Sequence, residues 1–98
     1  VLLVKSLLEI AAEEYAIGIV DGNIVNKYEY QDAFGFTTVA KNILNDSEAL
    51  SPSEEVKRNK IIEIIENLSS LWPSLVPTKK ISGDASEILT AISEIKSL

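Results

Sequence analysis

The chain has 98 residues, a formal net charge of −6 and a pI near 4.5. This length predicts a single domain over residues 1–98, and the ordinary apolar share argues against disorder. The acidic balance disfavours nucleic acid as a partner, because both molecules would carry negative charge. No run in the sequence is apolar over the ~20 residues that a membrane-spanning helix needs.

Three residue types are missing from the sequence, and each absence narrows the chemistry. Without Cys or His, the chain has no disulfide, thiolate or imidazole metal site, and no nucleophilic triad of the usual kind. We therefore expect a protein that is not an enzyme. The chain also contains no Met, not even at position 1, which predicts that an initiator, signal peptide or upstream domain has been removed.

Apolar residues recur at helical spacing in four segments. They predict helices near residues 2–20, 27–45, 52–71 and 84–97. Asn26, Ser51 and Asp84 each stand three positions before a Glu, which is the pattern of a capping box at a helix start. Asp21-Gly22-Asn23 is expected to end the first helix, with Gly22 at positive φ. The short connectors favour an all-α fold, an antiparallel four-helix bundle built from two helical hairpins.

Aromatic side chains are concentrated in the first half of the chain. Tyr15 and Tyr30 fall on the apolar sides of the first two predicted helices, where core filling is the simpler interpretation. The alternative is a ligand pocket lined by these two rings.

Four acidic residues flank the turn between the first two helices: Glu14, Asp21, Glu29 and Asp32. An antiparallel hairpin would bring them to the same end of the bundle, where their oxygens could bind iron or another oxygen-ligated cation. The competing interpretation gives each acid a local role. Glu29 would then cap its helix, Asp21 would belong to the turn, and Glu14 would pair with a hydroxyl or an ammonium group.

The runs L-L-E-I-A-A-E-E-Y, G-I-V-D-G-N-I-V-N and E-Y-Q-D-A-F-G-F resemble the helical extracytoplasmic extension of some bacterial high-affinity iron permeases. The resemblance covers residues 2–44. It consists of an acid–Tyr pair that ends one helix, a V-x-D-G-x-V turn and an E-Y-x-E start to the next helix, where Asp32 replaces the last Glu. The membrane helices, the Arg-Glu-x-x-Glu motifs and the Cys-x-x-Cys-His haem attachment of such permeases are absent from this sequence.

The resemblance implies an extracytoplasmic, periplasmic location and a supporting role in iron uptake by sensing, delivery or assembly; a cytoplasmic location stays open. We expect a non-enzymatic module with a protein partner or a homo-oligomeric state, and we expect a homodimer to use the third or fourth helix. The alternative is a structural bundle that self-associates and takes no small-molecule ligand.

Overall fold

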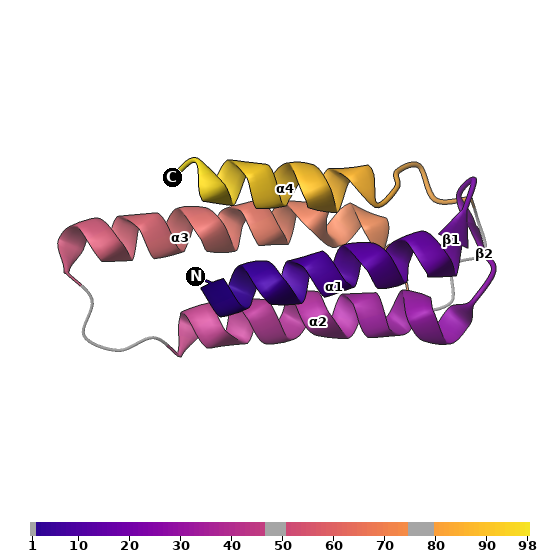
Figure 1. The fold of residues 1–98 in the computed structure, drawn as a ribbon, viewed down its shortest axis with the longest axis horizontal. Helices are drawn as coiled ribbons and strands as arrows, with labels where there is room; N and C mark the ends of the chain where they lie inside the picture. The colour runs from indigo at the N-terminus through magenta and orange to yellow at the C-terminus, as the bar shows by residue number, and fades with distance from the viewer. Residues whose placement is uncertain (1, 47–50, 75–79) are drawn as a thin grey trace.

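Four helices account for most of the computed structural model, which describes residues 2–46, 51–74 and 80–98 (Figure 1). They are α1 (Leu2–Gly18), α2 (Lys27–Asn45), α3 (Pro52–Glu66) and α4 (Ser86–Lys96). A 3₁₀ helix, η1 (Asn67–Leu71), continues α3. Consecutive helices run in opposite directions along a molecule of 43 × 22 × 19 Å.

The predicted all-α, four-helix fold is confirmed, and the second helix has the predicted bounds. The third predicted helix is divided between α3 and η1, because the chain tightens to 3₁₀ geometry before Trp72-Pro73. The division of the bundle into two hairpins remains a prediction. Although α1 makes its most extensive contacts with α2, it also packs against α4.

The connection between α1 and α2 is a small β-hairpin rather than a simple helix-ending turn. Strands β1 (Ile19–Val20) and β2 (Asn23–Ile24) pair antiparallel. Asp21 and Gly22 between them have φ values of 53° and 79°, the two positive values of a type I′ turn. The prediction for the φ of Gly22 is confirmed. The prediction that this turn ends the helix is wrong, because α1 already ends at Gly18.

Gly18 lies in close contact with the backbone at the start of α2. A Cβ atom placed on it would lie 2.7 Å from the backbone nitrogen of Tyr30 and 3.0 Å from the carbonyl oxygen of Asn26. The Gly18 carbonyl also accepts hydrogen bonds from the N–H groups of Val25 and Asn26, at 2.8 and 3.2 Å. A larger residue would push the two helices apart.

The predicted capping boxes have different outcomes. The one at Ser51 and Glu54 forms in both directions. At α2, the Asn26 side chain accepts from the Glu29 N–H. The predicted box at Asp84 is wrong: α4 begins after Ala85, and the Asp84 carboxylate accepts from the N–H and hydroxyl of Ser86 instead. These hydrogen bonds lower the pKa of Asp84.

We predict that Gly18→Ala lowers the free energy of unfolding by about 1–3 kcal/mol, the usual cost of overpacking. Gly35→Ala is the matched control, since a Cβ on this α2 residue would meet no atom within 4 Å. This control should gain up to about 1 kcal/mol from better helix propensity. Urea melts of the two variants measure the difference, and equal changes would contradict the close contact at Gly18.

Candidate carboxylate site at the α1–α2 hairpin

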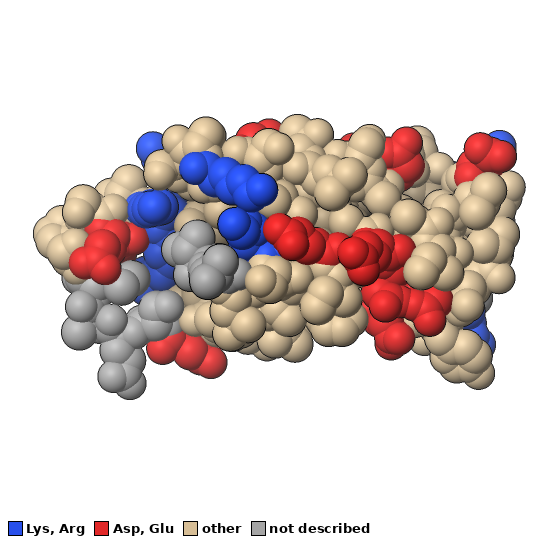
Figure 2. All heavy atoms as spheres, in the orientation of Figure 1, with Lys and Arg blue, Asp and Glu red and all other residues tan. Residues whose placement is uncertain are grey.

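Three carboxylates converge where the last turns of α1 lie beside the first turns of α2. Glu14 comes from α1, and Glu29 and Asp32 come from α2. One oxygen atom of each lies within 4.8 Å of the others. Glu14 and Glu29 are half-buried, and Asp32 is exposed. Acidic side chains gather over the face where the two helices run together (Figure 2).

Local backbone geometry sets the position of each acid. Glu29 and Asp32 are three residues apart on α2, so they share one side of that helix. In a complete capping box the Glu29 carboxylate would accept from the Asn26 N–H. That N–H donates instead to the Gly18 carbonyl, and the Glu29 carboxylate lies with the other two acids.

One oxygen atom in this group lacks a hydrogen-bond partner. The Oε2 atom of Glu14 is buried, and no donor reaches it among the described residues. A buried acceptor without a partner has lost its water and gained nothing in exchange, which destabilises the fold. The same carboxylate places an oxygen atom within 4.8 Å of an oxygen of Glu29 and of Asp32, and a positive charge between the three acids would offset their repulsion.

Asp21, the fourth acid predicted for the site, does not belong to this group. It occupies the first central position of the type I′ turn with an exposed side chain. A position of the turn that requires positive φ favours Asp, Asn or Gly, so its local role in the turn explains this residue. The structure therefore brings together three of the four predicted acids.

Tyr15 and Tyr30 are core residues, as the simpler interpretation of the sequence expected. Both are fully buried. The Tyr15 hydroxyl donates to the carbonyl of Leu71, and the Tyr30 hydroxyl donates to the carbonyl of Ser74, each at 2.8 Å. The Trp72 ring stands edge-on to Tyr15 at 5.1 Å, and its indole N–H donates to the Tyr30 carbonyl at 2.9 Å.

Burial raises the pKa of both tyrosines above their ordinary value near 10. For Tyr15 the nearby Tyr30, Glu87 and Asp84 raise the pKa further. Each phenol therefore stays protonated and bonded to a carbonyl near neutral pH. Both hydroxyl groups are therefore engaged inside the core and are not among the three converging acids.

The chemistry of three carboxylates suits a hard cation. Oxygen ligands of this kind bind Ca²⁺, Mg²⁺, Mn²⁺ and similar ions, whereas softer ions favour nitrogen or sulfur. The exposed Asp32 leaves one side of the group open to solvent, through which an ion and its remaining waters can enter.

Sequence reasoning missed Gly18, which positions the three acids. The available signal was a glycine one helical turn after Glu14.

These features define a small helical module with a cluster of three carboxylates on its first helix pair. The chain belongs to the family of the iron permease-associated 4-helix bundle domain, which matches it over residues 1–98. The resemblance seen over residues 2–44 is thereby confirmed and extends to the whole chain. No curated protein and no solved structure matches it. Among the described helices, none combines the length and apolar character that crossing a membrane requires.

We predict that alkaline pH destabilises the protein through Tyr15. Its pKa is raised in the folded state. Its contribution to the free energy of unfolding is therefore intact below the unfolded pKa of ~10 and is lost as the pH rises from there through the folded pKa. Tyr15→Phe should lose about 1 kcal/mol at neutral pH with the Leu71 hydrogen bond. It should also show a smaller fall in stability at high pH than the parent, measured by urea melts. An unchanged alkaline fall would contradict this role.

Proposed function

We propose that this domain is a non-enzymatic module of an iron-uptake system, located outside the cytoplasmic membrane, and that it holds a hard cation among Glu14, Glu29 and Asp32. The cation would be iron or another oxygen-ligated ion. The observation that carries the proposal is that Glu14, one of the three converging acids, has a buried Oε2 atom without a hydrogen-bond partner among the described residues.

The electrostatics of the group support this proposal. Like charges this close repel each other, most strongly where burial keeps water away. The ion pair that the described residues form is Arg58–Glu55 on α3, so none of the described lysines or arginines forms an ion pair with these three acids. A bound cation would remove the repulsion and supply a partner for Glu14. The alternative that Glu29 serves only to cap its helix is less favoured, because the Asn26 N–H that it would accept from already donates to the Gly18 carbonyl.

The experiment compares thermal melts with and without Ca²⁺, Mn²⁺, Fe²⁺ and Fe³⁺ for the parent and for the variants Glu14→Gln, Glu29→Gln and Glu13→Gln. Glu13 is the matched control, because it is the exposed neighbour of Glu14 on α1 and carries the same charge. At a hundredfold excess over its Kd, a cation should stabilise the parent by about 2.7 kcal/mol. The rise should persist in Glu13→Gln and shrink in Glu14→Gln and in Glu29→Gln.

Two outcomes would contradict this proposal. If none of the four ions stabilises the parent, the domain does not hold a hard cation at this site. If Glu13→Gln and Glu14→Gln lose the response equally, the ions act on the overall charge and not on the convergent group.

Self-association is the second candidate function, and exposed apolar side chains favour it. Leu3, Ile10 and Ile17 recur every seven residues along α1, with exposed fractions of 58%, 37% and 56%. Seven residues are nearly two helical turns, so the three form one stripe. On α3 and α4 the exposed large apolar residues are Val56 and Leu89. The stripe therefore favours a dimer interface on α1, whereas the sequence led us to expect an interface on the third or fourth helix.

Light scattering at micromolar concentration tests this candidate. A homodimer should have twice the monomer mass of 10.7 kDa. If α1 forms the interface, Ile10→Glu should restore the monomer mass and Leu89→Glu should not. If Leu89→Glu restores the monomer mass and Ile10→Glu does not, α4 forms the interface. A parent that is already monomeric would rule out self-association at this concentration.

A further inference from the structure

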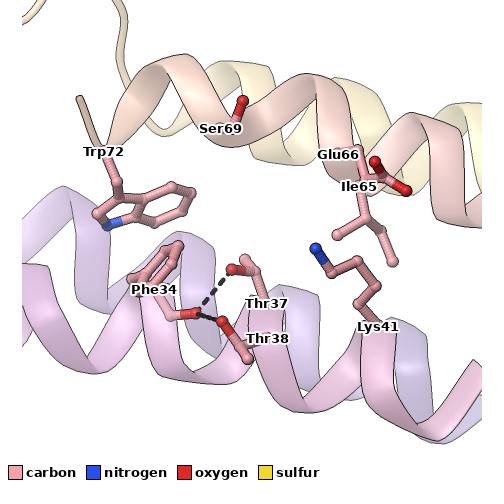
Figure 3. Close-up of a pocket in the computed structure, with 8 residues that line it drawn as sticks. All are labelled: Phe34, Thr37, Thr38, Lys41, Ile65, Glu66, Ser69 and Trp72. Carbon is pink, nitrogen blue, oxygen red and sulfur yellow. Dashed lines mark hydrogen bonds between the residues drawn. The ribbon is translucent and has the colours of Figure 1, made fainter. Parts of the chain in front are cut away.

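A groove of about 170 Å³ lies between α2 and the continuous helix formed by α3 and η1 (Figure 3). The contacts of α2 with α3 are much less extensive than those with α1, so the groove follows a loosely packed seam. Its lining has an aromatic end at Phe34 and Trp72 and a charged end at Lys41 and Glu66. The hydroxyl groups of Thr37 and Thr38 lie between these ends.

The aromatic end is a preformed apolar wall. The rings of Phe34 and Trp72 are 5.6 Å apart between centroids and tilted by 51°. Trp72 is held in place because its indole N–H donates to the Tyr30 carbonyl. Phe34 is 39% exposed, so part of its surface remains available to a ligand ring. Trp72 is only 8% exposed, so a flat aromatic ligand would pack mainly on Phe34 and meet the edge of the indole ring.

The charged end presents one positive and one negative group that do not pair with each other. Among the described residues no ion pair joins Lys41 to Glu66. Lys41 stands two helical turns after Phe34, about 10 Å along α2. Its ammonium group points into the groove (Figure 3). A molecule in the groove would therefore meet a ring-binding wall at one end and both charges at the other.

The threonines add acceptors rather than donors. The hydroxyls of Thr37 and Thr38 both donate to the Phe34 carbonyl, at 2.7 and 3.1 Å. A hydroxyl whose hydrogen is already used still offers oxygen lone pairs. The middle of the groove can thus accept hydrogen bonds from a ligand N–H group.

We propose that this groove binds a zwitterionic aromatic α-amino acid. The ring would pack on Phe34 and Trp72, the carboxylate would bind the Lys41 ammonium, and the ligand ammonium would bind Glu66 and the threonine oxygens. A zwitterion uses both charged residues. It also avoids the repulsion that a simple anion would meet on a chain of net charge −6. The site shares no residue with the carboxylate group at the hairpin.

The test is a titration of the full chain with L-phenylalanine, followed by calorimetry and by the fluorescence of Trp72, the only tryptophan. N-acetyl-L-phenylalanine removes the ligand's positive charge, phenethylamine removes its carboxylate, and alanine removes its ring. In the parent each should bind at least about tenfold more weakly than phenylalanine, because a charge-assisted hydrogen bond or the ring contact is lost.

Two variants test which protein residue binds each charge of the ligand. Lys41→Met should weaken phenylalanine binding and abolish the preference for phenylalanine over phenethylamine. Glu66→Gln should abolish the preference over N-acetyl-phenylalanine. Lys96→Met and Glu63→Gln are the matched controls, since both residues are exposed and neither lines the groove, and they should keep the parent's preferences.

The proposal is overturned if the parent shows no saturable binding of phenylalanine. It is also overturned if Lys41→Met and Glu66→Gln leave the ligand preferences unchanged, or if the parent binds peptides with an internal phenylalanine but not the free amino acid.

Discussion

The close approach of α1 to α2 at Gly18 is the contact on which the rest of the molecule depends. A backbone nitrogen and a carbonyl oxygen occupy the space where a side chain would stand. With the helices this close, Glu14 reaches Glu29 and Asp32, and the rings of Tyr15 and Tyr30 come within 5.9 Å. The same contact between helix ends thus brings together the two tyrosines in the core and the three carboxylates at its edge.

An acid followed by a tyrosine occurs on each side of this contact. Successive helical residues point about 100° apart. When the tyrosine enters the core, its preceding acid is therefore carried to the rim of the same interface. The tyrosines fix the ends of the helices through hydrogen bonds to Leu71 and Ser74, and this holds Glu14 and Glu29 in place. The residues that stabilise the fold also position the candidate site.

Local patterns predicted the features that depend on nearby residues. Apolar periodicity and the cap at Ser51 placed the helices, and hairpin geometry brought Glu14 to Glu29 and Asp32. The errors arose where two local hydrogen bonds compete or where a distant partner decides. Asp84 bonds to Ser86 instead of capping its helix, and Asp21 is held in a tight turn away from the acids. The acceptors of the tyrosine hydroxyls lie 56 and 44 residues away, and helical spacing contains no information about them.

The amide of Ile81 donates to the carbonyl of Gly22 at 2.9 Å, so the tip of the first hairpin is bonded to the segment that leads into α4. The hairpin itself is built from neighbours in the sequence, and such contacts form early because the loop they close is short. The hydrogen bond that Gly22 accepts, and those that Tyr15 and Tyr30 donate, instead join this hairpin to residues in the second half of the chain. These three hydrogen bonds therefore tie the helix pair that holds the carboxylates to the second half of the chain, so the geometry of the acids depends on residues that lie far from them in the sequence.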